Sequence, residues 1–169
     1  MGMYIKSEGK GLDDLKKRLE FLKHHKLMIG IPEKKSARKG KKSARKGGDI
    51  TNVALAFIHT NGSPRRGIPP RPFLEPGLVK TGALDRISTL MGEAARAAVN
   101  GQQSEAHALM ESAAQEGADS VQEYILAGVS PGLAESTRAA KARKKSTKDV
   151  PLVDTSSMLK SIVGVVEED

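Results

Sequence analysis

The chain has 169 residues, the length of one domain, and no cysteine, which excludes disulfides, thiolate catalysis and zinc–thiolate sites. Only 3% of its residues are aromatic, so a core must be built from aliphatic side chains and alanine. A formal net charge of +8 favours acidic partners such as nucleic acid, an acidic protein surface or an anionic membrane. No segment approaches the roughly 20 apolar residues of a membrane helix, and the N-terminus lacks the apolar run of a secretory signal.

The N-terminal part of the chain predicts a strand, a helix and a second strand. Residues 3–9 are compatible with a short edge strand. Residues 11–26 predict an amphipathic helix, with acidic residues in its first turn and basic residues in its last, as the helix dipole favours. Residues 26–32 predict a strand that Pro32 ends. The apolar face of the helix consists of Leu12, Leu15, Leu19 and Leu22.

A basic repeat follows, with the sequence KKSARKG at residues 34–40 and again at 41–47. It contains no large apolar residue, so we expect a solvated, flexible loop that buries no core. Such a loop either keeps the protein soluble or neutralises phosphates. Because it has no aromatic residue to stack on bases, any nucleic-acid binding would be sequence-independent and salt-sensitive. The candidate contacts with DNA phosphates or an acidic partner are Lys34, Lys35, Arg38, Lys39, Lys41, Lys42, Arg45 and Lys46.

An apolar helix and a proline-rich connector come next. Residues 49–62 predict a helix that Thr51 or Asn52 caps and Gly62 ends. The helix places Val53, Ala54, Phe57 and Ile58 on one face.

The connector that follows is basic and extended, and it leads into IPPRPFLEPGL at residues 68–78. This segment holds Phe73 and Leu74 on a proline-stiffened backbone. Two roles remain open for them. They seal the core of the single chain, or they anchor a contact with another subunit, because stiffness lowers the ordering cost of docking.

The second half of the chain predicts two long alanine-rich helices. Residues 73–100 are helical in pattern, with a late start or an irregular first turn because Pro76 removes a hydrogen bond. Residues 104–127 predict a second helix, whose stripe of small residues suits close antiparallel packing on the first. Residues 136–149 are a second basic segment, which we expect to be flexible.

The C-terminus predicts a short helix capped by Asp154 or Thr155, and then a strand over residues 161–168. This strand can pair with residues 26–32 and close a small sheet from the two ends of the sequence. The predicted fold is therefore one α+β domain over residues 1–169. It has a small antiparallel sheet, flanking helices, a long Ala-rich helical pair, and flexible basic inserts at about 33–49 and 136–149.

Catalytic chemistry is not indicated. The histidines are His24, His25, His59 and His107, and none has the spacing of a metal site. The chain has no nucleophile elbow and no phosphate-binding loop, and its acidic residues are scattered. We therefore expect no enzyme activity, no cofactor and no catalytic or metal-binding residues.

Two segments carry a resemblance to a known family. Residues 52–78, NVALAFIHTNGSPRRGIPPRPFLEPGL, resemble an apolar helix ending in Ile-His-x-x-Gly, a variable basic loop and Ile-Pro-x-Arg-Pro-Phe-Leu-x-Pro. Residues 151–162, PLVDTSSMLKSI, resemble Pro-Leu-x-Asp-Thr-Gly-x-Leu-x-x-Ser-Ile. In this order, both are typical of the tail-completion (head–tail joining, or neck) proteins of long-tailed double-stranded-DNA phages and prophages. Ser156 departs from the usual glycine, and Thr60-Asn61 from the usual acidic-aromatic pair.

The resemblance implies a structural virion protein, assembled in the host cytoplasm, that forms a ring, typically hexameric, in the neck of the particle. The implied partners are further copies of the chain, head–tail connector or stopper proteins, and a tail tube or tail terminator protein. Non-specific contact with genomic DNA in the lumen is a further option, and no membrane is involved. The candidate interface residues are Arg65, Arg66, Ile68, Arg71, Phe73 and Leu74. The alternative function is a non-specific nucleic-acid-binding protein that uses the basic loops.

Overall fold

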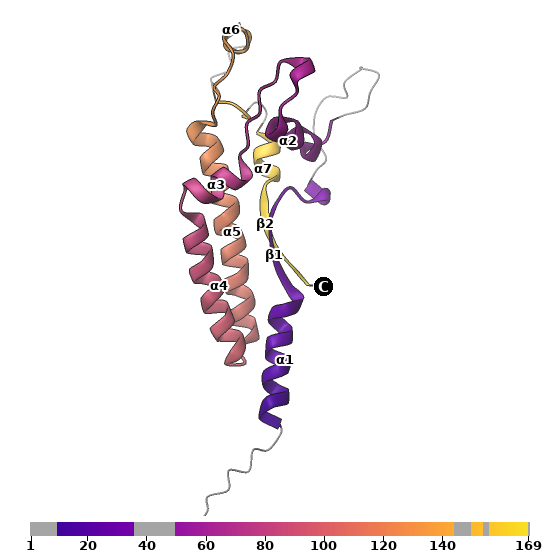
Figure 1. Cartoon of the computed structure of the whole chain (residues 1–169), viewed down its shortest axis with the longest axis vertical. Helices are drawn as coiled ribbons and strands as arrows, with labels where there is room; N and C mark the ends of the chain where they lie inside the picture. Colours follow the sequence, from indigo (N-terminus) through magenta and orange to yellow (C-terminus); the bar gives the residue numbers. More distant parts are fainter. Residues whose placement is uncertain (1–9, 36–49, 144–149, 154–155, 169) are drawn as a thin grey trace, which may run out of the picture.

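A helical hairpin and a two-stranded antiparallel sheet form the body of the molecule in the computed structural model (Figure 1). The structure describes residues 10–35, 50–143, 150–153 and 156–168. The hairpin consists of α4 (Ala83–Val99) and α5 (Gln103–Gly128), and the sheet of β1 (His25–Gly30) and β2 (Val163–Glu168). The predicted α+β class is confirmed.

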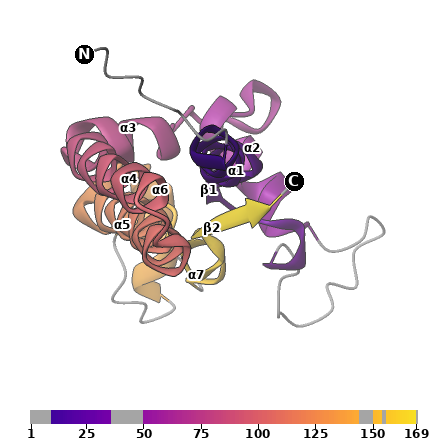
Figure 2. The ribbon, with the colours of Figure 1, turned by 90° about the horizontal axis from the view of Figure 1, so that it is seen from below.

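The sheet joins the two ends of the sequence, as predicted. The helix α1 (Lys10–His24) runs directly into β1, which pairs with β2 in the register His25 to Glu168 through Gly30 to Val163. This register places the basic start of β1 opposite the acidic end of β2, and aliphatic residues opposite each other between them, which stabilises both strands. Viewed from below, the α4–α5 hairpin lies on one side of the sheet (Figure 2).

Small residues set the close packing of the hairpin and the sheet. Ala94, Ala98, Ala106 and Ala113 are fully buried along the hairpin, as the predicted alanine stripe requires. The strand β2 crosses α5 where Gly164 lies against the backbone of Ala114, so closely that a Cβ at Gly164 would overlap the carbonyl of Ala114. Glycine at this position therefore decides how closely the sheet approaches α5.

The helix predicted over residues 73–100 is divided into two helices. α3 spans Leu74–Lys80, and Gly82 adopts a left-handed conformation (φ 71°) before α4 begins. Pro76 is the third residue of α3, where the missing N–H costs no intrahelical hydrogen bond. Of the two predicted alternatives, a helix that begins late is therefore the correct one. The positive φ of Gly82 explains why α3 and α4 are separate helices.

Two short helices flank the upper end of the hairpin. α2 (Asn52–Asn61) is capped by Thr51, whose hydroxyl accepts a hydrogen bond from Ala54 N at 3.1 Å, and it ends at Gly62 as predicted. α7 (Ser157–Ser161) begins after Ser156, whose backbone is left-handed (φ 59°). Ser156 occupies the N-cap position, and the predicted cap at Asp154 or Thr155 lies outside the described part of the chain.

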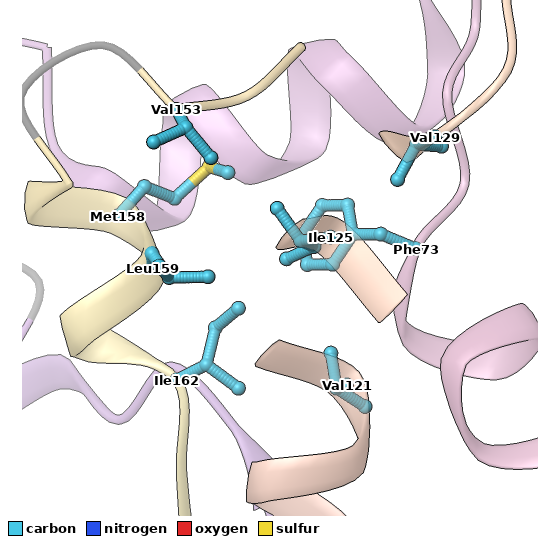
Figure 3. Packing of buried hydrophobic residues seen from close by; sticks show 8 residues of the cluster. All are labelled: Phe73, Val121, Ile125, Val129, Val153, Met158, Leu159 and Ile162. Carbon is cyan, nitrogen blue, oxygen red and sulfur yellow. The ribbon is translucent and has the colours of Figure 1, made fainter. Parts of the chain in front are cut away.

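The main core lies between these short helices and the upper half of α5 (Figure 3). Phe73 at the start of α3 fills its centre. Figure 3 shows Ile125 of α5 and Met158, Leu159 and Ile162 of the C-terminal segment around it. The buried members are Phe73, Val121, Ile125, Val129, Val153, Met158, Leu159 and Ile162.

One basic insert is more ordered than predicted. Residues 136–149 were expected to be flexible, but Glu135–Arg143 form the helix α6. Its alanine, lysine and arginine residues have high helix propensity, and Glu135 favours the positive end of the helix dipole. Every described side chain of α6 is exposed, so the helix is solvated rather than part of the core.

Other predictions lie partly outside the described residues. The strand expected over residues 3–9 and the repeat from residue 36 onward cannot be compared with the structure. Glu33–Lys35, just before that point, form the 3-10 helix η1. Within the described ranges, no helix combines the length and apolar character needed to cross a bilayer.

Two glycine-to-alanine substitutions test the close crossing of β2 and α5. Gly164→Ala should lower the free energy of unfolding by about 3 kcal/mol, because the methyl group meets backbone that cannot move aside. Gly92→Ala, in open space on the exposed face of α4, should raise it by about 1 kcal/mol. Urea denaturation measures both. Equal stability of the two variants would contradict the crossing geometry.

Candidate subunit and partner interface

The basic connector after α2 is a closed loop that displays two arginines. Ser63 and Ile68 exchange two backbone hydrogen bonds, Ser63 N to Ile68 O at 2.7 Å and Ile68 N to Ser63 O at 3.0 Å. Between them the 3-10 helix η2 (Pro64–Arg66) carries Arg65 and Arg66, both exposed. Gly62 (φ 75°) begins the loop, and a Cβ there would lie 2.8 Å from Ile68 O. The loop therefore presents two cations on a constrained backbone.

Arg71, by contrast, faces inward and is only 7% exposed. Its backbone N–H donates to His59 O at 2.6 Å, which fixes the proline segment to the end of α2. Its guanidinium donates to Pro131 O at 2.6 Å and to Gly132 O at 2.8 Å. Arg71 therefore holds the proline segment, α2 and the loop after α5 together within one chain, which accounts for its position without a partner.

Phe73 is fully buried in the core of the single chain. Of the two roles left open by the sequence, the structure provides the first: the proline segment positions an aromatic side chain for intrachain packing. Ile68 and Leu74 are half-buried, and Leu74 packs against the same core. Only Arg65 and Arg66 of the six predicted interface residues are exposed. An interface role for this set stays a prediction.

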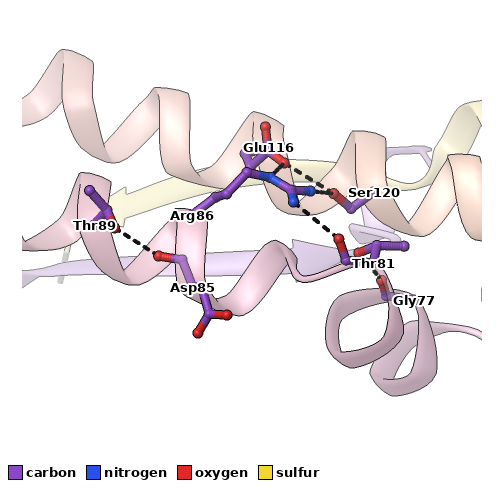
Figure 4. A network of polar contacts seen from close by, with 7 residues as sticks. All are labelled: Gly77, Thr81, Asp85, Arg86, Thr89, Glu116 and Ser120. Carbon is purple, nitrogen blue, oxygen red and sulfur yellow. Dashed lines mark hydrogen bonds and ion pairs between the residues drawn. The ribbon is translucent and has the colours of Figure 1, made fainter.

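A polar network that the sequence did not indicate positions α3 against the hairpin (Figure 4). Arg86 of α4 donates to the carboxylate of Glu116 at 2.6 Å, to Ser120 Oγ at 3.1 Å and to Thr81 O at 3.0 Å. It therefore links the α3–α4 break to α5. A neighbouring glycine tightens the same region, because a Cβ at Gly77 would lie 3.0 Å from Val121 Cα.

The two segments that resemble tail-completion proteins lie together in space. Asn52 of the first segment is 1% exposed, and its Nδ2 donates to Ser157 Oγ at 3.3 Å. The same Nδ2 also reaches Lys35 O at 3.4 Å. Phe73 of the first segment and Met158 of the second share the main core. Segments about a hundred residues apart thus build one packed unit at the upper end of the molecule.

Several large apolar side chains are exposed on the surface. On α1, Leu12, Leu15 and Leu19 are 63%, 37% and 49% exposed, although the sequence predicted one apolar face there. Only the C-terminal end of that face is covered, where Phe21 and Leu22 pack against small residues of the hairpin. We call Leu12, Leu15 and Leu19 the leucine face. An exposed face of several leucines is a candidate contact surface for another molecule.

The helix α2 also differs from the prediction in which face it buries. Val53 and Phe57, expected to share a face with Ala54 and Ile58, are 43% and 68% exposed. Asn52 is buried instead, and Leu55 and Ala56 pack against the main core. The helix is apolar on nearly all sides, so its periodicity alone did not identify the buried side.

The candidate phosphate contacts are only partly described. Lys34 and Lys35 are exposed on η1, and Arg38, Lys39, Lys41, Lys42, Arg45 and Lys46 lie outside the described residues. No group of three or more acidic, histidine or cysteine side chains among the described residues could hold a metal ion.

Comparison with known proteins provides no assignment. No protein-family model, no curated protein and no solved structure matches this chain.

Two phenylalanines provide a matched test of the core. Phe73→Ala should lower the free energy of unfolding by about 3–5 kcal/mol, because it removes the centre of the main core. Phe57→Ala, at a side chain that is 68% exposed, should change it by less than about 0.5 kcal/mol. Thermal or urea unfolding of the purified variants measures this. A stable Phe73→Ala protein would show that the segment does not depend on its aromatic ring.

Proposed function

We propose that this chain is a structural virion protein that completes the tail of a long-tailed phage, or joins the head connector to the tail tube, as one subunit of a ring around the DNA channel. The main support for the proposal is that the two segments that resemble tail-completion proteins contact each other in the structure. Residues of both share a hydrogen bond at Asn52 and Ser157, and they share the core around Phe73. Two motifs that contact each other in the structure indicate this family more specifically than either motif does alone.

The exposed apolar surface supports an assembly role. The leucine face of α1 and the exposed Val53 and Phe57 of α2 lie on separate elements of an elongated molecule (Figure 1). A subunit that contacts a neighbour on each side and other rings above and below needs several such surfaces. An enzyme or a monomeric binding protein has no comparable need for them.

The distribution of charge favours a ring subunit over a protein that binds DNA tightly. α5 carries five acidic residues and no lysine or arginine, despite the net charge of +8 of the whole chain. The described cations include exposed Arg65 and Arg66 on a loop tip, the basic residues of α6, and exposed Lys16, Lys17 and Lys23 of α1. Contact with DNA in the lumen would thus involve these segments, while the acidic α5 contacts protein.

Genetic complementation tests the proposal. In the phage or prophage that encodes the chain, inactivating its gene should leave filled capsids and complete tails unjoined, and supplying the wild-type chain should restore joining. Phe57→Ser should restore joining less well than Glu93→Ser, since both side chains are exposed but only Phe57 is apolar. Electron microscopy of lysates counts joined particles. Normal joining without the chain would refute the proposed function.

Deleting one repeat copy separates this proposal from the nucleic-acid-binding alternative. Removal of residues 41–47 takes away four basic residues, Lys41, Lys42, Arg45 and Lys46. If the chain acts by binding DNA, the slope of log affinity against log salt should fall by about 3 to 4 units and activity should be lost with it. We expect joining to persist, as measured by titre in the complementation assay. Loss of joining together with DNA affinity would favour the alternative.

A further inference from the structure

A groove of about 640 Å³ lies between α5 and β2, and none of the described residues of α1 lines it. Its floor and walls include Ala108, Glu111, Ser112 and Gln115 of α5, and Gly164 and Val165 of β2. The lining combines small residues with the polar side chains of Glu111, Ser112 and Gln115. We call this the α5–β2 groove.

A copy's own α1 packs chiefly on α4 and does not line this groove. α1 packs through Phe21 and Leu22 on the cluster that includes Ala106, two residues before Ala108. Two residues correspond to about 200° around a helix axis, so Ala106 and Ala108 face nearly opposite directions. The leucine face and the groove are therefore two separate surfaces of one molecule, and neither covers the other.

Positively charged side chains lie beside the leucine face on α1. The N-terminal half of α1 extends beyond the end of the α4–α5 hairpin (Figure 1). Lys16 and Lys23 are exposed, and they follow Leu12 and Leu19 by four residues each, so each lies beside the leucine face. Lys16 and Lys23 are separated by about 10.5 Å along the helix axis.

Negative charge lies in the groove and beyond it on α5, at a spacing close to that of the two lysines. Glu111 lines the groove, and exposed Asp119 lies outside it, about two turns later and about 12 Å along the axis of α5. Two other polar groups lie against these carboxylates. His107 Nδ1 is 3.7 Å from Glu111 Oε2, and Gln115 Nε2 donates to Asp119 Oδ1 at 2.7 Å. Both carboxylates remain on the exposed side of α5, where a pair of lysines can reach them.

We propose that the α5–β2 groove of one copy receives the leucine face of α1 from the next copy, with Lys16 and Lys23 beside Glu111 and Asp119. Each copy then offers a helix to one neighbour and a groove to the other. Such a head-to-tail contact closes into a ring when the rotation between copies permits it. The inference deepens the proposed function, on whose ring it rests, by naming the surfaces through which the copies join.

Cross-linking between copies tests this contact, because the natural chain has no cysteine to interfere. Leu15→Cys protein is mixed with Ser112→Cys protein that carries a mass tag, and a short bismaleimide is added. Only a contact between molecules gives the mixed dimer. The matched control replaces Ser112→Cys by Ser88→Cys, at another exposed serine, on α4. We expect a severalfold higher yield of mixed dimer with Ser112→Cys than with Ser88→Cys.

Charge reversal tests the orientation of the contact. Lys16→Glu in the Leu15→Cys chain should lower the yield by about threefold or more, the size expected of an exposed ion pair. Glu111→Lys in the Ser112→Cys chain should restore it. Circular dichroism checks that each variant folds. Equal yields at Ser112 and Ser88, or a yield that charge reversal does not change, would overturn the contact.

Two further outcomes are informative. If α1 served a membrane instead, the wild-type chain would float with phosphatidylglycerol vesicles while the Ser112 yield stayed at the Ser88 level, and the proposal would be wrong. Cross-linking in assembled particles separates this inference from the proposed function. Joined particles without the Leu15–Ser112 product would refute the contact alone. The product in purified protein, together with normal joining in the absence of the chain, would refute the function alone.

Discussion

The burial of Phe73 is the interaction on which the rest of the fold depends. The chain has three phenylalanines; Phe57 is exposed, Phe21 is half-buried and Phe73 alone is fully buried. Around it meet the start of α3, the upper half of α5 and the C-terminal segment that leads into β2. The lower half of the hairpin is lined by alanine, which permits close packing but buries little apolar area per residue. Stability is therefore concentrated at the upper end, and α1 is held at the other end by a small cluster and by the hydrogen bond from Arg18 to Val99 O.

The prolines between residues 68 and 72 help to position Phe73 in this core. They hold an extended backbone between α2 and α3, and Arg71 fixes that backbone to the loop after α5 through two carbonyl groups. A stiff segment with one buried cation and one buried aromatic ring costs less entropy to order than a flexible one would. The result is a rigid upper end, from which Arg65 and Arg66 project on a short closed loop. The surfaces that we propose for contacts with other molecules lie elsewhere, on α1, on the outer side of α2 and along α5.

The sequence pattern predicted the structure correctly where the periodicity of a single element determines how that element packs. The alanine stripes predicted the hairpin, and the aliphatic runs near the two ends predicted β1 and β2. The sequence pattern did not predict the structure where residues far apart in the sequence determine whether a side chain is buried. Arg65, Arg66 and Arg71 look alike in sequence, and only the carbonyl groups at Pro131 and Gly132 make Arg71 an interior residue. The leucines of α1 predicted a covered face, yet no described part of the chain lies over most of it. For Phe73 the buried partners lie 48 (Val121) to 89 (Ile162) residues further along the sequence, so the sequence alone did not determine its role.

We propose that this chain forms part of the ring through which DNA passes from head to tail. The most direct test is cryo-electron microscopy of the neck in particles assembled with this chain. We expect density for a ring of these subunits between connector and tail tube, with the α4–α5 hairpin of each copy against protein and the loops of Arg65 and Arg66 exposed at its surface. A complete neck whose density contains no copy of this fold would contradict it.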